Sequence, residues 1–339
     1  MQLNAFYLET RTQNFRNLVL VVILNGNKMS KNDLINCHER IKPFIHNTPV
    51  LTSKLINDLT GADIYFKCEN FQKMGAFKMR GAANAVLKLS DEQKNNGVVT
   101  HSSGNHAQAI SLAAKKIGIK AYIVMPSNAP EIKKIAVKSY GGELIECEPN
   151  LVARETAAKK IVDSKGATFI HPSNNLDVII GQGTSSKELI EECGSFDHIL
   201  VPIGGGGLSA GTALAVKYFG NECSVIGTEP LEVDDAYRSL ISGKIESNRT
   251  TNTIADGLKT QLGDNNFPII LEEVKSIIRI TEDEIIESMK LIWQHLKIIC
   301  EPSCSLPLAG VIKNKEQFLG KKIGIIITGG NVDLKNLPF

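Results

Sequence analysis

A lysine among small and apolar residues is the first feature of this sequence that suggests chemistry. Lys78 lies in the stretch Lys73-Met-Gly-Ala-Phe-Lys-Met-Arg-Gly-Ala82, directly after Phe77. An amine held against such neighbours is desolvated, which lowers its pKa and suits it to Schiff-base chemistry. A single lysine of this kind can equally be a surface group with a buried stem. The prediction therefore depends on the other motifs of the chain.

Four consecutive glycines follow a predicted strand over 198–203 and open a predicted helix: Gly204, Gly205, Gly206 and Gly207. Without Cβ atoms, several backbone N–H groups can converge on an anion at a helix N-terminus. A dinucleotide fingerprint is the alternative, because Gly205-x-Gly207-x-x-Ala210 is followed by Glu229 at the end of the next predicted strand. That alternative predicts a nicotinamide-dependent oxidoreductase.

Polar residues follow predicted strands at two further places. The stretch Ser102-Ser103-Gly104-Asn105-His106 comes after a strand predicted over 98–101 and opens a helix. Its hydroxyls, amide and N–H groups would hold a carboxylate, whereas a helix cap alone needs only one such residue. Thr328, followed by two glycines, closes the strand predicted over 323–328. A simple turn and a ligand site are equally consistent with this second place.

Carboxylates are concentrated in the loop Glu229-Pro-Leu-Glu-Val-Asp-Asp235. Hard divalent cations take oxygen ligands of this kind. Alternatively, acids in the first turn of the following helix complement its dipole. The residues alone leave both interpretations open.

The elements that must position these motifs alternate between strand and helix. Further strands are predicted over 63–68, 121–125, 143–147, 168–171, 224–229 and 276–280, and helices over 105–117, 129–140, 151–164, 181–192, 208–219 and 282–296. Such alternation indicates an α/β fold with parallel sheets, whose ligands bind beyond the carboxyl ends of strands. No low-complexity linker divides the 339 residues, so two lobes would be interwoven.

Composition narrows the class of protein and of partner. The chain is 42% hydrophobic and 22% charged with a net charge of +2, which favours neither a nucleic acid nor a membrane as partner. Its seven cysteines show neither a disulfide framework nor zinc-ligand spacing, which indicates a reducing compartment. Residues 1–28 are interpreted as a disordered leader, with Met29 as an alternative start. The cytoplasm is expected, with a mitochondrial presequence as the alternative.

Taken together, the motifs resemble those of the fold-type II pyridoxal-phosphate enzymes. Phe77-Lys78, the 102–106 stretch, the four glycines, Ile254-Ala-Asp-Gly257 and Gly329-Gly-Asn-Val-Asp333 occur in family order, and the resemblance covers about Leu34 to Leu334. Within the family the chain is most similar to serine racemases and serine/threonine dehydratases. The resemblance implies a homodimer with a tryptophan-synthase-β-like fold. Its large cofactor-binding domain would comprise 29–90 and 172–339, and its small domain 91–171.

The resemblance also implies roles for individual residues. Lys78 would bind pyridoxal 5′-phosphate covalently and Phe77 would flank it. The glycines 204–207 would hold the phosphate, Asn105 the ring 3′-oxygen and Thr328 the pyridine nitrogen. The substrate carboxylate would be bound by Ser102, Ser103, Asn105, His106 and Arg154.

The implied activity is serine racemisation, with Lys78 and Ser103 exchanging protons on opposite faces of the α-carbon. Elimination from serine, with threonine as a further substrate, would yield pyruvate or 2-oxobutanoate and ammonia. The first alternative is a serine/threonine dehydratase (ammonia-lyase) with little racemase activity. An NAD-dependent oxidoreductase is the remote alternative.

Three further expectations follow from the resemblance. Glu229, Asp235 and the Val233 carbonyl would bind Mg²⁺ or Ca²⁺, with Mn²⁺ as a substitute. Lys73 and Tyr140 match part of an ATP effector site, although Met74 replaces a threonine and leaves ATP activation open. The segment Glu301-Pro-Ser-Cys-Ser-Leu-Pro307 replaces a run of smaller residues, so Cys304 and Pro307 are expected to alter a helix near the cofactor.

Overall fold

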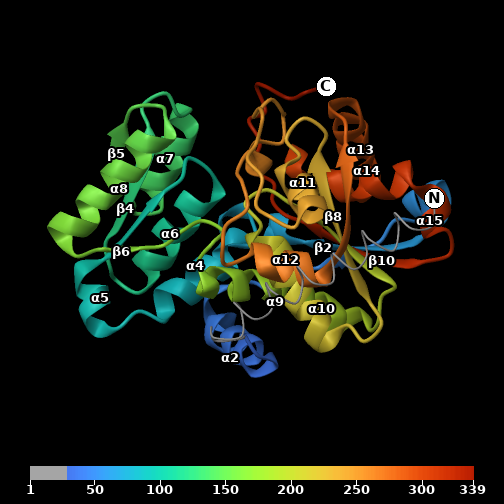
Figure 1. The fold of residues 1–339 in the computed structure, drawn as a ribbon, viewed down its shortest axis with the longest axis horizontal. Coiled ribbons are helices and arrows are strands. Elements are labelled where there is room, and N and C mark those ends of the chain that lie inside the picture. Colours follow the sequence, from blue (N-terminus) through green and yellow to red (C-terminus); the bar gives the residue numbers. More distant parts are fainter. Residues whose placement is uncertain (1–28) are drawn as a thin grey trace, which may run out of the picture.

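The computed structural model describes residues 29–339, which form an α/β fold with two mainly parallel sheets (Figure 1). The larger sheet has six strands in the order β1-β2-β10-β7-β8-β9. Its strands are β1 (Val50–Leu51), β2 (Asp63–Cys68), β7 (His198–Pro202), β8 (Ser224–Pro230), β9 (Val274–Ile280) and β10 (Lys322–Ile327). Only the short β1 runs antiparallel to its neighbour.

The smaller sheet has four parallel strands in the order β5-β4-β3-β6. They are β3 (Val98–His101), β4 (Ala121–Pro126), β5 (Glu143–Cys147) and β6 (Thr168–Phe169). All four come from the middle of the chain, and Figure 1 shows them with their helices as a separate lobe on the left. The domain bounds at 90/91 and 171/172 stay a prediction.

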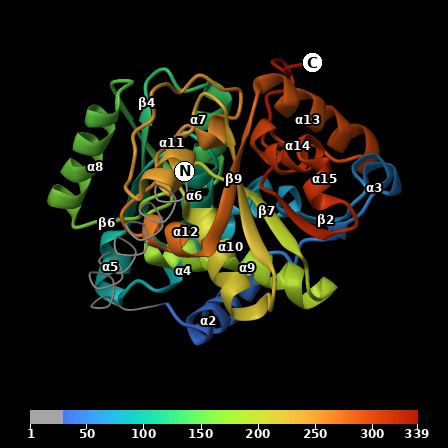
Figure 2. The same ribbon diagram turned by 45° about the vertical axis from the view of Figure 1, so that its right-hand side comes forward.

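Helices cover both sheets, as the turned view in Figure 2 also shows. The helices of the smaller lobe are α5 (Asp91–Asn96), α6 (Asn105–Lys116), α7 (Glu131–Ser139) and α8 (Leu151–Lys165). The remaining helices are α2 (Lys31–Ile41), α3 (Lys54–Thr60), α4 (Lys78–Leu87), α9 (Leu176–Cys193), α10 (Gly207–Phe219), α11 (Asp235–Ser242), α12 (Phe267–Glu273), α13 (Glu282–Leu296), α14 (Leu306–Lys313) and α15 (Lys315–Phe318). Short 3₁₀ turns are η1 (Lys42–Phe44), η2 (Glu69–Phe71), η3 (Lys73–Gly75), η4 (Asp256–Leu258) and η5 (Pro302–Cys304).

The larger lobe is built from both ends of the described chain. β10 pairs in parallel with β2 over its whole length, from Lys322 opposite Asp63 to Ile327 opposite Cys68. β10 and β7 are buried along nearly their whole length, since helices cover both faces of the sheet. The chain therefore leaves this lobe after α4 and returns with α9, which makes the two lobes interwoven.

Most elements predicted from sequence are confirmed, although many bounds differ by one or two residues and the start of α9 differs by five. The strands at 63–68, 98–101 and 143–147 and the helix at 282–296 have the predicted limits. The strand predicted over 168–171 ends at Phe169. α9 begins at Leu176 instead of 181, because the Asn175 side chain accepts a hydrogen bond from the N–H of Val178 and caps the helix.

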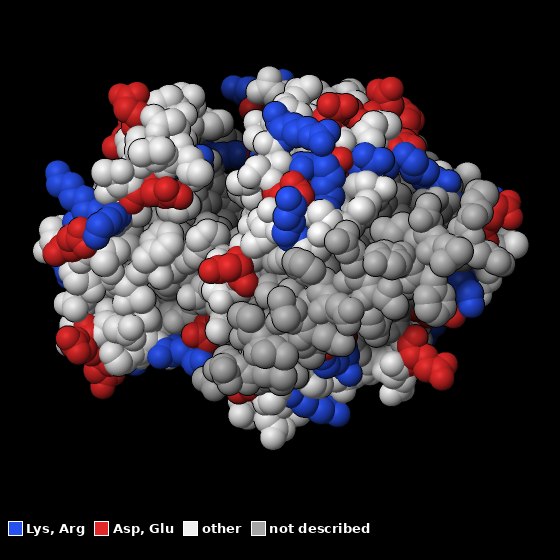
Figure 3. Space-filling model, viewed as in Figure 1, with Lys and Arg blue, Asp and Glu red and all other residues white. Residues whose placement is uncertain are grey.

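The leader predicted over 1–28 lies outside the described residues. Within residues 29–339, no helix is both long enough and apolar enough to cross a bilayer. Figure 3 shows acidic and basic side chains interspersed on the face it displays, with a hollow between the two lobes.

Candidate active site

The segment that carries Lys78 is attached to the end of β10. Ala76 forms an antiparallel bridge with Gly329. The N–H of Phe77 donates to the carbonyl of Thr328 at 2.9 Å. Lys78 is the next residue and begins α4, so its position follows from that of the central strand.

The amine of Lys78 is desolvated and has a carbonyl as its partner. Its Nζ donates to the carbonyl oxygen of Pro172 at 2.8 Å and lies 5.0 Å from the centre of the Phe77 ring. Burial lowers the pKa of Lys78 to about 8, although the carboxyl of Glu301 acts to raise it. A large share of the amine is therefore neutral near pH 8, the form that acts as nucleophile or base.

The four glycines form a loop with no room for side chains. A Cβ at Gly204 would lie 2.8 Å from the carbonyl oxygen of Gly257, and one at Gly207 would lie 2.9 Å from backbone atoms of Ser173. Gly206 has a φ of 81° and precedes α10, which has no side-chain cap. Within residues 29–339, the N–H groups of 204–209 have no acceptor. They form a cradle that suits a phosphate.

The polar stretch 102–106 connects β3 to α6, a helix that also begins without a side-chain cap. The hydroxyl of Ser102 accepts from the N–H of Gly104 at 3.3 Å. Ser103 is half-buried, and its hydroxyl makes no hydrogen bond in the described part of the chain. The side chain of His106 instead lies in the interior, with Nε2 3.3 Å from the carbonyl of Ile170 and Nδ1 without a partner.

His106 is a neutral imidazole in this position. Burial lowers its pKa well below the usual value, and the nearby charge of Lys78 acts in the same direction. Its ring therefore has no positive charge to offer a carboxylate, and the available contribution is its backbone N–H. The expectation of a carboxylate contact by His106 is limited to that group.

Asn105 connects this stretch to the end of β10. Its Nδ2 donates to both carboxylate oxygens of Glu301, at 3.0 and 3.1 Å. Its Oδ1 accepts from Asn331 at 2.8 Å, and Asn331 also donates to the carbonyl of Met74 at 3.0 Å. Burial raises the pKa of Glu301 to about 7, with the charge of Asp256 acting in the same direction.

Glu301 is a site residue that the sequence reasoning did not single out. In the sequence it stands out only as the first residue of the unusual segment 301–307. The signal that could have found it is a lone acid within the otherwise uncharged run from Ile298 to Ile312. A carboxylate in such an apolar run is expected to be buried and to have polar partners. Buried carboxylates of this kind are common at functional sites.

Thr328 is buried and touches a thiol. Its Oγ1 lies 3.1 Å from Sγ of Cys304, and the same thiol donates to the carbonyl of Gly329 at 2.9 Å. The expected effect of Cys304 and Pro307 on a helix near the cofactor stays a prediction. Pro307 lies in the first turn of α14, where a missing N–H costs no hydrogen bond.

The carboxylates of Glu229 and Asp235 are both buried at the N-terminus of α11. Glu229 accepts from the N–H groups of Ala236 and Tyr237 at 3.0 and 2.9 Å. Asp235 accepts from Leu262 N–H at 3.1 Å through one oxygen, and its other oxygen has no partner. Burial raises the pKa of Glu229 well above its usual value, and the neighbouring Asp235 adds to this. Burial also raises the pKa of Asp235 to about 6.

Both oxygens of Glu229 accept from backbone N–H groups in the first turn of α11, as the helix-dipole interpretation expects. Within residues 29–339 no group of three or more His, Cys, Asp and Glu side chains is placed to hold a metal. A cation bound here would need carbonyl oxygens or water, and Val233 is a buried source of a carbonyl.

The remaining predicted residues lie on the smaller lobe and on η3. Arg154 on α8 is half-buried, and its Nε reaches the carbonyl of Asn150 at 3.4 Å. Burial lowers the pKa of His101, and the charge of Arg154 lowers it further. Burial lowers the pKa of Lys73, and no hydrogen bond joins Lys73 to Tyr140 in the described residues.

Four of the predicted motifs converge on one region. Lys78 contacts Pro172, and the next residue, Ser173, packs on the glycine loop. The Phe77–Thr328 bond adds the end of β10, and the Asn105–Asn331 bond adds the 102–106 stretch. The Glu229–Asp235 pair lies apart, with its hydrogen bonds directed to α11 and to Leu262.

The geometry can be compared with known proteins. Residues 41–329 match the family model described as pyridoxal-phosphate dependent enzyme. The β-hydroxyaspartate dehydratase of Paracoccus denitrificans is 49% identical, over 91% of this chain and 98% of that protein. The serine racemase of Dictyostelium discoideum is 48% identical, over 90% and 95%. Its crystal structure has a TM-score of 0.86 at 49% identity, covering 89% of this chain and 98% of that one.

Proposed function

The chain belongs to the family of pyridoxal-phosphate dependent enzymes, and from this premise we propose that it is a serine racemase that also eliminates water from serine. The observation that carries the proposal is the amine of Lys78. It is desolvated, has a pKa of about 8 and donates to a carbonyl instead of a carboxylate. Membership of this family rules out the nicotinamide alternative.

The residues around Lys78 fit the cofactor of the family. The N–H groups of 204–209 would hold its phosphate, because they lack acceptors and begin α10. Phe77 would flank the ring and Thr328 would face the pyridine nitrogen. The Nδ2 of Asn105, whose partner in this structure is Glu301, would turn one of its two N–H groups to the 3′-oxygen. A threonine hydroxyl, unlike a carboxylate, would leave that nitrogen largely unprotonated.

Proton exchange at the α-carbon falls to two residues of this chain. When bound, pyridoxal phosphate draws electrons from the α-carbon of an attached amino acid and so acidifies its proton. The Nζ of Lys78 would take that proton on one face, which its pKa near neutrality allows. On the opposite face the Oγ of Ser103 would deliver a proton, and its hydroxyl makes no competing hydrogen bond in residues 29–339.

The substrate carboxylate would be held by the stretch between β3 and α6. Ser102, Ser103 and Asn105 would contribute side chains, and His106 its backbone N–H. This fixes the α-carbon between the two proton-carrying groups. If the β-hydroxyl leaves before a proton returns, the products are pyruvate and ammonia. Ser103 therefore decides between a racemase and a dehydratase with little racemase activity.

Arg154 favours a second candidate substrate, 3-hydroxyaspartate. Its half-buried guanidinium forms no ion pair within residues 29–339, so it could bind a second carboxylate. A relative of nearly equal similarity is described as a β-hydroxyaspartate dehydratase. Elimination from this substrate would give oxaloacetate and ammonia.

We also propose that Mg²⁺ or Ca²⁺, replaceable by Mn²⁺, binds Glu229, Asp235 and the Val233 carbonyl. The support is the pair of buried acids with raised pKa values and the unpartnered oxygen of Asp235. A homodimer in the cytoplasm, and ATP as an effector near Lys73 and Tyr140, belong to the same proposal and rest on the family resemblance alone.

The test is to incubate the purified protein with pyridoxal phosphate, Mg²⁺ and L-serine, with and without ATP. D-serine and pyruvate are measured together, and a parallel sample with 3-hydroxyaspartate is assayed for oxaloacetate. We expect both D-serine and pyruvate. Pyruvate without D-serine would instead establish a dehydratase, and no product from either substrate would contradict the proposal.

A further inference from the structure

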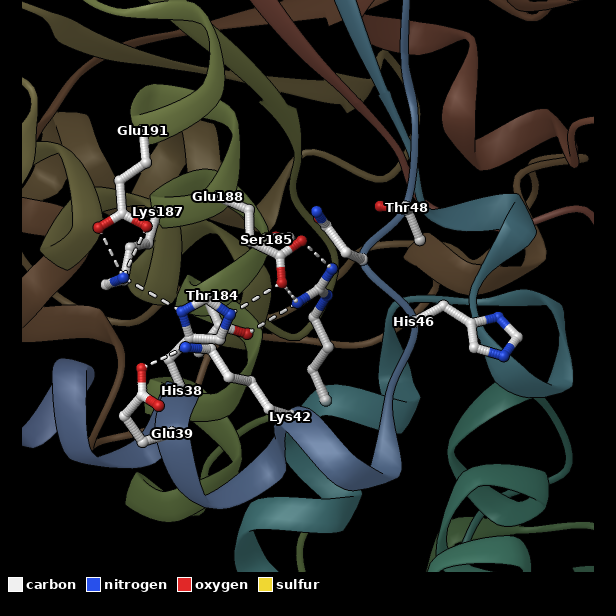
Figure 4. A network of polar contacts seen from close by, with 12 residues as sticks. His38, Glu39, Lys42, His46, Thr48, Thr184, Ser185, Lys187, Glu188 and Glu191 are labelled. Atoms are coloured by element: carbon white, nitrogen blue, oxygen red, sulfur yellow. Dashed lines mark hydrogen bonds and ion pairs between the residues drawn. The ribbon is translucent and has the colours of Figure 1, made fainter.

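A buried group of charged residues surrounds a single guanidinium, and Figure 4 shows it with His38, Thr184 and Glu188 labelled. We call Arg80, Glu69, Glu188, Lys67 and His38 the Arg80 cluster. Arg80 is fully buried, and each of its five N–H bonds has an acceptor. Nε and Nη2 donate to Glu69 at 2.7 and 2.8 Å, Nη1 and Nη2 donate to Glu188 at 2.8 and 2.7 Å, and Nη1 also donates to Thr184 at 3.2 Å.

The other members of the Arg80 cluster are equally well paired. Lys67 is fully buried and lies 3.0 Å from Glu188 while donating to the carbonyl of Thr48 at 2.7 Å. Nδ1 of His38 faces the ammonium of Lys187 at 3.1 Å, and because an ammonium only donates, this nitrogen carries no proton. Nε2 of His38 is then the donor to Glu188 at 3.0 Å. The positive charges of Arg80 and Lys67 are thus balanced in the interior by the two carboxylates of the cluster.

Arg80 and Lys78 act from opposite sides of one helix. Residues two positions apart in an α-helix, such as Lys78 and Arg80, are separated by about 200° around the helix axis. The guanidinium therefore points away from the reactive amine. Glu69 comes from η2, before the lysine segment, and Glu188 comes from α9. α9 begins shortly after Pro172, whose carbonyl accepts from the Lys78 amine. The cluster therefore connects α4 to the chain on both sides of the amine.

The backbones of α4 and α9 also approach each other closely at two glycines. A Cβ at Gly81 would lie 2.7 Å from the carbonyl of Val178, and one at Gly181 would lie 2.7 Å from the carbonyl of Arg80. Gly81 N–H donates to Oε1 of Gln182 at 3.1 Å. Steric contact sets how close the helices approach, and the directional bonds of Arg80 set the rotation and register of α4.

Stability alone does not explain why charges occupy this place. The cost of desolvating a buried ion pair often equals its attraction, and apolar side chains of the same volume stabilise a fold as well. A guanidinium with five directional bonds instead permits a single position of the helix that carries it. We infer that the Arg80 cluster is a positioning device for Lys78, which holds the first turn of α4 where the amine meets its substrate. This inference rests on the proposed function.

The test compares Arg80→Lys with a matched control, Arg40→Lys. A lysine keeps the charge of Arg80 but cannot form the paired bonds to Glu69 and Glu188. Arg40 also contacts α4, since its Nη1 donates to Asn84 at 2.6 Å, but at the far end of the helix. A displacement of the order of 1 Å can reduce turnover about 100-fold. We expect this loss in kcat of Arg80→Lys, with KM within about threefold, and less than about threefold change in Arg40→Lys.

A readout that does not depend on turnover is the circular dichroism of the bound cofactor, which reports how rigidly it is oriented. We expect Arg80→Lys to lose most of this signal, whereas Arg40→Lys keeps it. Thr48→Val provides a milder variant that folds if Arg80→Lys does not. It removes one hydrogen bond, 2.6 Å long, to Glu69 and leaves α4 untouched. We expect a smaller decrease of kcat and dichroism in the same direction.

Three results would separate the possible failures. If Arg80→Lys, or Thr48→Val where the former does not fold, keeps kcat and dichroism while its Tm falls, the cluster is only a stabilising feature. If KM rises while kcat is unchanged, the amine was not displaced, and the inference is also wrong. If the wild-type protein binds pyridoxal phosphate but converts neither serine nor 3-hydroxyaspartate, the proposed function fails. The dichroism comparison then still decides the inference.

Discussion

The two sides of α4 differ in how completely their polar groups are hydrogen-bonded. On the side of Lys78, the amine has one carbonyl partner, Ser103 has no partner in residues 29–339, and the glycine loop leaves its N–H groups without acceptors. On the side of Arg80, every N–H of the guanidinium is bonded. Groups left unpaired cost stability unless a ligand supplies their partners. The difference indicates that the Lys78 side of α4 binds ligands and that the Arg80 side fixes the position of the helix.

The pKa values follow the same division. Burial lowers the pKa of Lys78 to about 8 and raises that of Glu301 to about 7, so both titrate near neutrality. In the Arg80 cluster burial acts to lower the pKa of Arg80, but the carboxylates of Glu69 and Glu188 raise it. Hydrogen bonds from His38 and Arg80 lower the pKa of Glu188 despite its burial. The groups on the Lys78 side of α4 are therefore prepared to exchange protons, whereas Arg80 and Glu188 stay charged near neutral pH.

Lys78→Ala should have the largest effect on activity. We expect losses of at least about 10⁴-fold in both racemisation and elimination, because the base is removed together with the covalent attachment of the cofactor. The Tm should change little, since the amine is desolvated without an ion pair. Activity assays and thermal unfolding check this, with Lys88→Ala at the other end of α4 as control. Retained turnover in Lys78→Ala would place the base elsewhere.

Ser103→Ala should divide the two activities. We expect racemisation to fall about 10²- to 10⁴-fold, the range for a lost acid–base group, and elimination by less than about tenfold. D-serine and pyruvate measured in one reaction give the ratio directly, and Ser102→Ala is the adjacent control. Undiminished D-serine formation would show that another residue delivers the second proton.

Glu188→Ala should show the reverse pattern, with stability as the main loss. Removing this carboxylate leaves Arg80 and Lys67 partly unpaired in the interior, which costs about 3–5 kcal/mol. Denaturant unfolding measures the effect. The control is Glu192→Ala, because Glu192 is half exposed and lies 3.7 Å from Lys67. If the two variants were equally stable, the comparison between the sides of α4 would lose its basis.

Removal of divalent cations should make stability depend on pH. The folded pKa of Asp235 is about 6, above its ordinary 3.8, so the protonated carboxyl stabilises the fold. This contribution is complete below about pH 4 and is lost as pH rises through about 6; it amounts to roughly 3 kcal/mol. Mg²⁺ or Ca²⁺ should therefore raise the Tm at pH 7.5 far more than at pH 5. An equal rise at both values, or one that persists in Glu229→Gln, would contradict the site.

Cys304→Ala should have the smallest effect. It removes the contact of the thiol with Thr328 and its bond to Gly329, and a single hydrogen bond is worth about 0.5–1.5 kcal/mol. We expect a two- to tenfold change in turnover, with a shift in the absorbance of the bound cofactor. Cys68→Ala, equally buried in the same core, should leave the absorbance unchanged. An unchanged spectrum in Cys304→Ala would show that Thr328 is oriented without the thiol.

The Lys78 side of α4 could largely be predicted from sequence, because each of its motifs is a short continuous stretch of residues. The glycine loop and the 102–106 stretch each follow an apolar strand directly, and parallel strands bring their carboxyl ends to one edge. The ring of His106, however, turns inward to Ile170, which the motif does not specify. A pattern of residue types does not contain that choice between a side chain and a backbone N–H.

The Arg80 side of α4 could not be predicted from sequence, and neither could the helix itself. α4 has Gly81 in its interior, and its buried side chains include Arg80 and Asn84, so it lacks an apolar stripe. The carboxylate acceptors of Arg80 lie 11 and 108 residues away, at Glu69 and Glu188. Nothing in the sequence joins these three residues before the fold is known.

The most direct test of the account is to find which residue carries the cofactor. The protein is incubated with pyridoxal phosphate, reduced with borohydride, digested and analysed by mass spectrometry. We expect the phosphopyridoxyl group on the peptide that contains Lys78, and on no other lysine in comparable yield. A modified lysine elsewhere, or no modification of a protein that still converts serine, would contradict the assignment of Lys78.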